Sequence, residues 1–347
     1  MMIKVSIIGA TGYTGIELIR LLNRHKDVEI DSLFSNSHVG KNLVDLYPQF
    51  YGKKDYIFKE FTIDEVKNSD IVFTALPHGV SQGIVAKLYQ HGIKVIDLSG
   101  DYRYHDTKIY EDWYGVKHEY AEIAREAVYG LVELNRELIK DASLIANPGC
   151  YPTATLLGLL PVVKAGLIAN NEIIIDAKSG VSGAGKSVKI DTIFNEVDES
   201  IKAYSVNKHR HTSEIENILA GVINTKEGIK LSFTPHLIPM KRGMLITIYI
   251  RLSNEIKEEG LIQLYKEFYA RDSFLQIYKS GNPQTKHVLG SNYCHIGLNI
   301  DRRTNRLIIV SVIDNLLKGA SGQAVQNMNL MFGLPEERGL EDTAIFP

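Results

Sequence analysis

The chain has 347 residues, which is too long for one ordinary hydrophobic core and predicts about two domains. Its 39 basic and 41 acidic side chains leave a formal net charge of −2, which excludes a broad electrostatic attraction to nucleic acid or to an anionic membrane. The two cysteines, Cys150 and Cys294, lack metal-ligand spacing, and no run approaches the ~18 apolar residues of a membrane span, so we expect a cytoplasmic protein without a disulfide framework, a metal site or a membrane helix.

The N-terminal residues show a strand, a glycine-rich turn and a helix in succession. Residues 4–9 are a continuous apolar run, residues 16–23 have apolar side chains at helical spacing, and Gly9, Gly12 and Gly15 lie between them. This order is the context of a dinucleotide-binding fingerprint, in which the turn lets the backbone approach a pyrophosphate at the helix N-terminus. The spacing G-x-x-G-x-x-G is a variant of the usual one, and an ordinary turn between strand and helix is the alternative.

The second predicted strand, residues 29–34, ends in polar residues that bear on the choice of nucleotide. An NAD site usually has an acidic residue here for the ribose 2′-hydroxyl, whereas a 2′-phosphate needs hydroxyl and basic donors. Ser35, Ser37 and Lys41 follow the strand, and residues 35–41 contain no carboxylate. These residues favour NADP over NAD, with a solvated polar loop as the alternative.

Two further strands, residues 70–75 and 94–98, alternate with a helix over residues 81–90. This rhythm predicts a parallel sheet of the Rossmann type, whose ligands bind beyond the carboxyl ends of the strands. His78, Ser99 and Arg103 fall at these ends, and the guanidinium of Arg103 suits a phosphate or a carboxylate unless it is an ordinary surface arginine. The polar and aromatic stretch that follows, up to residue 125, has weak periodicity and predicts an excursion on the surface.

Cys150 stands at the mouth of a predicted helix. A short apolar strand over residues 143–147 is followed by the sharp turn Pro148-Gly149 and by a helix over residues 152–160. A helix N-terminus favours the thiolate, which is the nucleophilic form of cysteine. We therefore expect Cys150 to be a nucleophile, and the alternative is a small buried residue in a tight turn.

The glycine-rich residues 179–187 contain a formal match to the phosphate-binding P-loop, G-x-x-x-x-G-K-[ST], after a predicted strand over residues 172–177. The residues after Ser187 are a poor P-loop helix, and the chain already has a nucleotide turn at its start. The P-loop is therefore the weaker interpretation, and we expect a loop near the active site.

Two histidines, His209 and His211, precede a predicted helix over residues 214–220. A histidine within reach of a cysteine is what thiol catalysis needs, first as base and then as acid. A fragment of a metal site and a solvated loop are the alternatives, and the sequence shows no third ligand nearby.

The second half of the chain predicts a different architecture. Its strands, residues 231–234, 244–252, 292–300 and 306–314, are interrupted by one helix over residues 257–270, which indicates a mixed, largely antiparallel sheet. The basic turn at residues 235–243 suits an anionic ligand, and a last helix runs from about residue 319 to 332. The fold class is thus α/β, with a Rossmann-type NADP-binding domain over 1–149, completed by 320–347, and an α+β catalytic and oligomerisation domain over 150–319.

Eight segments, in this order along the chain, resemble the motifs of the N-acetyl-γ-glutamyl-phosphate reductase family. They are residues 9–15, 76–79, 97–103, 147–153, 179–185, 209–211, 234–243 and 319–329. Each motif alone is modest, but the set spans nearly the whole chain and is highly specific. Two small departures are Gly100, where the family usually has alanine, and Val132, where it usually has proline.

The resemblance implies that the protein reduces N-acetyl-L-glutamyl 5-phosphate with NADPH to the 5-semialdehyde and phosphate, in arginine biosynthesis. It implies that Cys150 attacks the acyl phosphate to form a thioester, and that His209, or His211 in its place, manages the proton as the hemithioacetal collapses. The family's habit implies a homo-oligomer, either a tetramer or a dimer.

The residue patterns and the resemblance together assign residues to ligands. The candidate substrate residues are Arg103, Asn147 and Arg242. The candidate cofactor residues are Gly9, Thr11, Gly12, Tyr13, Thr14, Gly15, Ser35, Ser37, Lys41, Pro77, His78, Ser182, Gly183 and Asn327.

Three alternatives stay open. A sister acyl-phosphate reductase, acting on aspartyl phosphate or on carrier-protein-linked aminoadipate or glutamate, would share the cofactor turn and the cysteine. A P-loop NTPase would hydrolyse ATP with magnesium and without Cys150. An NADP-sensing regulator would bind the cofactor without turnover and would leave Cys150 and His209 unexplained.

Overall fold

The computed structural model describes residues 2–223 and 228–345, which divide into two units. The first unit is Met1–Pro148 with Ala320–Glu341, and the second is Gly149–Gly319 with Asp342–Pro347. The predicted domains differ mainly at the end of the chain, where Ile345 N donates to Leu289 O at 2.8 Å within the second unit. The last two residues of the predicted tail, 346 and 347, lie outside the described residues.

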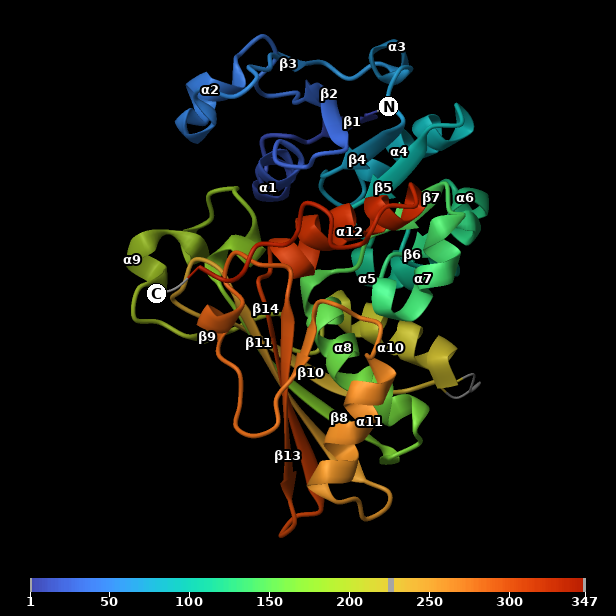
Figure 1. Cartoon of the computed structure of the whole chain (residues 1–347), viewed down its shortest axis with the longest axis vertical. Coiled ribbons are helices and arrows are strands. Elements are labelled where there is room, and N and C mark those ends of the chain that lie inside the picture. Colours follow the sequence, from blue (N-terminus) through green and yellow to red (C-terminus); the bar gives the residue numbers. More distant parts are fainter. Residues whose placement is uncertain (1, 224–227, 346–347) are drawn as a thin grey trace. The chain divides into compact units, whose positions relative to one another are not determined.

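The first unit is built on a seven-stranded sheet in which every pairing is parallel (Figure 1). In spatial order its strands are β3 (Phe58–Lys59), β2 (Val28–Phe34), β1 (Ile3–Ile8), β4 (Ile71–Thr74), β5 (Lys94–Asp97), β7 (Leu144–Ala146) and β6 (Val128–Tyr129). The central strands are continuous apolar runs because helices cover both faces of a parallel sheet. The Rossmann-type sheet predicted from the sequence is therefore confirmed, although the short strands β3 and β6 were not expected.

Helices surround this sheet. They are α1 (Tyr13–Leu22), α2 (Leu43–Leu46), α3 (Ile63–Val66), α4 (Ser81–Gln90), α5 (Thr107–Tyr114), α6 (Ala121–Glu126), α7 (Val132–Lys140) and, from the end of the chain, α12 (Gly322–Met331). One core cluster joins side chains of β1, β2, β4 and β5 to Val66 of α3, Val85 of α4 and Ala124 of α6. The C-terminal helix α12 packs against α1, α7 and β5.

The stretch predicted as a surface excursion, residues 104–125, is mostly exposed or half-buried, but it also contributes to the core. This stretch forms α5 and α6, and Tyr104, Tyr110 and His118 are buried. The aromatic rings pack on one another, with Tyr110 5.4 Å from His118 and 6.5 Å from Tyr104 between ring centroids. The periodicity is weak because aromatic side chains from α5 and from the loops on either side of it, rather than one regular apolar stripe, fill this part of the core.

The second unit contains a seven-stranded mixed sheet. Its strands in spatial order are β12 (Leu275–Ile277), β13 (Cys294–Asp301), β14 (Arg306–Ile313), β11 (Met244–Leu252), β8 (Ile168–Ser179), β10 (Leu231–Leu237) and β9 (Lys202–Ala203). Only β12 with β13 and β8 with β10 pair in parallel, so the largely antiparallel sheet is confirmed. On β11, Ile246, Ile248 and Ile250 are buried and alternate with less buried residues, as the period of two predicts.

Three long helices cover one face of this sheet (Figure 1). They are α8 (Cys150–Lys164), α10 (His211–Ile223) and α11 (Glu258–Phe268), and the single-turn helix α9 (Phe194–Val197) lies further along the chain from α8. Every residue of α8 from Tyr151 to Val163 is buried, because the helix is apolar all round and packs on β8, β11, β13 and β14 as well as on α10 and α11. A largely buried helix therefore begins at Cys150.

Candidate active site

The glycine turn after β1 has the backbone that a pyrophosphate requires. Gly9 has φ +82°, and a Cβ there would come within 2.3 Å of Ala75 O. A Cβ on Gly15 would come within 2.5 Å of Gly9 O. Gly12 caps α1, and the first turn of this helix carries no acidic side chain. The N-terminus of α1 can therefore receive an anion on its backbone N–H groups, which fits a dinucleotide.

Hydroxyl groups gather beside this turn, at the end of β2. Thr11 Oγ1 lies 3.1 Å from Ser35 Oγ, which is 3.4 Å from Ser37 Oγ. Ser35 is nearly buried, whereas Ser37 and Lys41 are exposed. The structure therefore brings together predicted cofactor residues from two loops, and their chemistry fits a 2′-phosphate.

The loop after β4 is held by the loop after β5. Gly100 N donates to His78 Nδ1 at 2.7 Å, which leaves the proton of a neutral His78 ring on Nε2. Asp101 accepts hydrogen bonds from Gly79 N at 2.9 Å and from Gln82 N at 3.1 Å. Burial, and to a smaller extent the charge of Asp97, raise the pKa of Asp101 to about 6. Neither acid was predicted as a site residue, although an acidic residue at the end of a buried parallel strand, as Asp97 is on β5, is a usable signal.

Arg103, Asn147 and Asn327 form one buried network in the first unit. Arg103 donates from Nε to Asn147 O at 2.8 Å and from Nη2 to Leu98 O at 3.1 Å. Asn327 Nδ2 donates to Asn147 Oδ1 at 3.1 Å and to Gly130 O at 2.9 Å. Arg103 is only 5% exposed, so its guanidinium lies among backbone carbonyls rather than at the surface. This geometry favours a role in joining β5, β7 and α12 over direct binding of substrate.

Cys150 is the first residue of α8, two residues earlier than the sequence predicts. It is half-buried, and Gly149 is the N-cap of the helix. Gly149 N donates to Glu214 Oε1 at 2.9 Å, and Glu214 is fully buried on α10. A Cβ on Gly319 would come within 2.8 Å of Cys150 Cβ, so only glycine leaves room there. The positive end of the α8 dipole favours a thiolate at this position.

Both histidines lie against the residue that follows Cys150. The ring of Tyr151 is 5.5 Å from the ring of His209 and 5.8 Å from that of His211, and the two histidine rings are 4.8 Å apart. His211 N donates to His209 Nδ1 at 3.2 Å, so the proton of the neutral ring is on Nε2. Burial, and to a smaller extent the charge of Arg210, lower the pKa of His209 to about 4. His209 is therefore neutral at pH 7.

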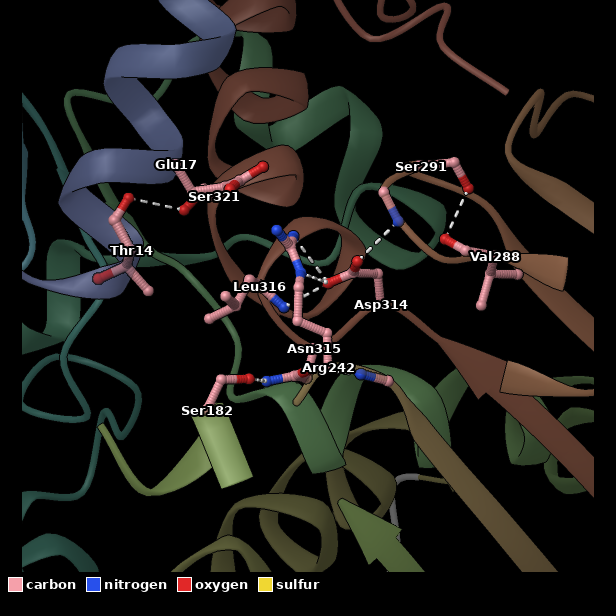
Figure 2. A network of polar contacts seen from close by, with 12 residues as sticks. Thr14, Glu17, Ser182, Arg242, Val288, Ser291, Asp314, Asn315, Leu316 and Ser321 are labelled. Carbon is pink, nitrogen blue, oxygen red and sulfur yellow. Dashed lines mark hydrogen bonds and ion pairs between the residues drawn. The ribbon is translucent and has the colours of Figure 1, made fainter. Parts of the chain in front are cut away.

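The glycine-rich loop after β8 is fastened to two other loops of the second unit (Figure 2). Gly180, Val181 and Ser182 donate their N–H groups to carbonyls of residues 240–243. Asn315 Nδ2 donates to Ser182 Oγ at 2.9 Å, and Asn315 Oδ1 accepts from Gly243 N at 2.8 Å. Because these N–H groups are already used and only short 3-10 turns follow, the loop does not form a phosphate cradle, and the P-loop interpretation fails.

Arg242 points toward a buried carboxylate in Figure 2. Its Nε and Nη2 lie 3.3 Å and 3.1 Å from Asp314 Oδ1. Asp314 is fully buried and also accepts from Gly290 N at 2.8 Å and from Leu316 N at 2.9 Å. Arg242 is itself partly exposed. Because its partner Asp314 is buried, the ion pair fixes the guanidinium in place within the second unit.

Within residues 2–223 and 228–345, no three His, Cys, Asp or Glu side chains are grouped to hold a metal ion. None of the helices in the described part of the chain is both long and apolar enough to cross a membrane.

Two protein-family models together match most of the chain. Residues 4–142 match the model described as "Semialdehyde dehydrogenase, NAD binding domain", and residues 150–315 match "Semialdehyde dehydrogenase, dimerisation domain". A protein of Halothermothrix orenii named N-acetyl-gamma-glutamyl-phosphate reductase is 58% identical, with 100% of both chains covered. A protein of the same name from Caldicellulosiruptor saccharolyticus is 52% identical, with 98% of both covered.

Solved structures share the fold at low sequence identity. Aspartate semialdehyde dehydrogenase II of Vibrio cholerae has a TM-score of 0.75 and 18% identity, over 96% of this chain and 99% of that one. Aspartate semialdehyde dehydrogenase of Candida albicans, solved with NADP, has a TM-score of 0.68 and 18% identity, over 96% and 99% of the two chains. These likenesses support the two-part α/β architecture.

Proposed function

We propose, since this chain belongs to the N-acetyl-γ-glutamyl-phosphate reductases of the semialdehyde dehydrogenase family, that it reduces N-acetyl-L-glutamyl 5-phosphate to N-acetyl-L-glutamate 5-semialdehyde and phosphate. The observation that carries this proposal is the position of Cys150, at the N-terminus of a buried helix and next to a tyrosine that packs against two histidines. The product is an intermediate of arginine biosynthesis, and we expect the reaction in the cytoplasm.

Cys150 begins the reaction as a thiolate, the form that the N-terminus of α8 favours. Its sulfur attacks the carbonyl carbon of the acyl phosphate, the bond from that carbon to the phosphate oxygen breaks, and phosphate leaves a thioester on Cys150. When bound, the nicotinamide cofactor supplies the hydride for the reduction. The thioester carbon becomes a tetrahedral oxyanion, which then expels the Cys150 thiolate and forms the aldehyde.

We propose that His209 assists at the oxygen of this intermediate. Its Nδ1 accepts the His211 N–H, so Nε2 carries the proton of the neutral ring and can donate to the oxyanion. A neutral imidazole is a weak acid, and the thiolate leaves the oxyanion without needing a proton. We therefore propose that His209 acts mainly as a hydrogen-bond donor, with His211 as the alternative, in place of the full acid and base cycle expected from the motif.

We also propose that the cofactor is NADP rather than NAD. Ser35 Oγ lies 3.1 Å from Thr11 Oγ1 of the glycine turn and 3.4 Å from Ser37 Oγ, and Lys41 is exposed further along the loop that follows β2. Such donors suit a 2′-phosphate, and no carboxylate occupies residues 35–41 to bind a 2′-hydroxyl. The match of residues 150–315 to a dimerisation domain supports a homo-oligomer, and we expect a dimer or a tetramer.

The reverse reaction tests the proposal. Reduction of NADP should follow addition of N-acetyl-L-glutamate 5-semialdehyde only when inorganic phosphate is present, and Cys150→Ser should abolish it. Aspartate semialdehyde serves as the comparison substrate. Turnover with that aldehyde alone would move the protein to a sister reductase, phosphate-independent turnover would contradict the acyl-phosphate route, and retained activity in Cys150→Ser would remove the cysteine as nucleophile.

A further inference from the structure

The loop after β4, residues 75–80, begins against the glycine turn. A Cβ on Gly9 would come within 2.3 Å of Ala75 O and within 3.3 Å of Leu76 Cδ2. Strands β1 and β4 are parallel neighbours, so the loops that follow them lie at the same edge of the sheet. A ligand on the glycine turn would therefore adjoin residues 75–80, which include His78 and which we call the His78 loop.

Asp101, in the loop after β5, accepts hydrogen bonds from the backbone of the His78 loop and of α4. Gly79 N donates to its Oδ1 at 2.9 Å, and Gln82 N donates to its Oδ2 at 3.1 Å. The carboxylate thus caps α4 from another loop, because the N-cap residue, Val80, carries no polar side chain. Asp101 is fully buried, and its pKa of about 6, raised by burial and by the charge of Asp97, leaves the ionised acceptor dominant at pH 7.

Other side chains hold Asp101 and Gln82 in turn. Tyr110 Oη donates to Asp101 Oδ1 at 2.9 Å, and Tyr102 Oη donates to Gln82 O at 2.7 Å. His118 Nε2 lies 2.8 Å from Asp101 O. All five of these side chains are buried, so the carboxylate cannot turn away from the His78 loop without breaking contacts in the core of the first unit.

We propose that Asp101 is a positioning residue that holds the His78 loop in the conformation that binds the dinucleotide cofactor. Gly100 N, next to Asp101 in the chain, donates to His78 Nδ1 at 2.7 Å, so the neutral ring presents its proton on Nε2. The ring of Tyr114 packs edge-on against His78, at 5.2 Å between centroids. An N–H donor fixed in this way suits an oxygen of a ribose or a phosphate, whereas Asp101 itself need not touch the cofactor. The inference rests on the proposed function, which requires NADP.

Asp101→Ala tests this role by removing both acceptors. Isothermal titration calorimetry should give a Kd for NADP about 10-fold higher than that of the wild type, because part of the binding free energy is then used to order the loop. The kcat at saturating NADP should stay near the wild-type value, since Cys150 belongs to the second unit.

The conservative variant Asp101→Asn should restore most of the affinity for NADP. Its amide oxygen can accept from Gly79 N and Gln82 N, while its NH₂ group donates to Tyr110 Oη. Recovery of the Kd in this variant would show that the hydrogen bonds, rather than the charge, position the loop.

Asp106→Ala is the matched control. Asp106 caps α5 by accepting from Lys108 N at 3.0 Å, as Asp101 caps α4, so both alanine variants should lower the melting temperature, and only Asp101→Ala should weaken NADP binding. If far-UV circular dichroism shows that Asp101→Ala does not fold, Asp101→Ser replaces it, because a serine hydroxyl is too short to reach both N–H groups.

An unchanged Kd in the folded variant would overturn the inference, and so would equal weakening of NADP binding in Asp101→Ala and Asp101→Asn or in Asp101→Ala and Asp106→Ala. NADP binding by a wild type that shows no phosphate-dependent turnover would count against the proposed reaction alone, because the comparison of Kd values still decides the role of Asp101. A wild type that binds neither NADP nor NAD would contradict the proposed function and this inference with it.

Discussion

The neutral state of His209 has a measurable consequence for stability. Its pKa of about 4 in the folded protein lies below the ordinary value of 6.5, so between these pH values the unfolded chain binds more protons and stability falls as pH is lowered. The loss amounts to roughly 3 kcal/mol across the window, at ~1.4 kcal/mol for each pKa unit. Urea unfolding at a series of pH values should show a shallower loss in His209→Asn. An equal slope in both proteins would mean that His209 is not held neutral.

Gly100 shows how one residue adapts to its neighbours. A Cβ at Gly100 would lie 2.2 Å from Tyr114 Oη and 2.7 Å from Tyr114 Cζ, and Tyr114 stacks on Tyr110 with ring centroids 4.5 Å apart. The ring of Tyr114 therefore occupies the space where the alanine usual in the family would place its methyl group.

Replacement of Gly100 by alanine should consequently destabilise this chain, by about 1–3 kcal/mol for an overpacked core. The loss should shrink when the tyrosine is also truncated, because the two substitutions share one space. Thermal unfolding of Gly100→Ala, Tyr114→Leu and the double variant measures the coupling. Additive losses would show that the two side chains do not compete.

At the scale of elements, Glu214 joins the helix of the nucleophile, α8, to α10, the helix that begins at His211. Its Oε1 accepts the N–H of Gly149, directly before Cys150, and it is fully buried. Glu214→Ala leaves that N–H without its carboxylate, at a cost of about 1–3 kcal/mol, and should lower kcat by up to about 10²-fold by displacing Cys150.

The conservative variant Glu214→Gln separates position from charge. Its amide oxygen can still accept from Gly149 N, so most of kcat should return, and alkylation of Cys150 by iodoacetamide should be at least as fast as in the wild type because a nearby negative charge is gone. Equal losses in both variants, with slow alkylation in both, would indicate that the charge itself is required.

Some of these elements could be predicted from the sequence, whereas the contacts of particular side chains could not. Strands β1, β4, β5 and β11 follow from apolar runs and alternation, and the glycine turn follows from its place between strand and helix. Glu214 could not be singled out, because an acidic residue in the first turn of a helix normally faces solvent. Burial of Arg103 depends on carbonyls contributed by Leu98 and by Asn147, which is 44 residues further along the chain, and such contacts leave no local pattern.

At the scale of the whole molecule, the two units divide the work. The hydroxyls that we assign to the 2′-phosphate belong to the first unit, and Cys150, His209 and Glu214 belong to the second. A ligand that binds only the folded protein stabilises it by about 2.7 kcal/mol at a concentration 100-fold above Kd. NADP should therefore raise the melting temperature of the wild type, and more strongly than NAD does.

Two single variants should separate the functions of these units. Ser35→Asp places a carboxylate against the 2′-phosphate, so it should abolish stabilisation by NADP, retain or improve that by NAD, and leave the alkylation rate of Cys150 unchanged. Cys150→Ser should keep stabilisation by NADP, because the hydroxyls remain, and should lose alkylation at this position, because the nucleophile is gone. Undiminished stabilisation of Ser35→Asp by NADP would place the 2′-phosphate elsewhere. A loss of NADP stabilisation in Cys150→Ser would mean that cofactor binding depends on the second unit, so that each unit contributes to both steps.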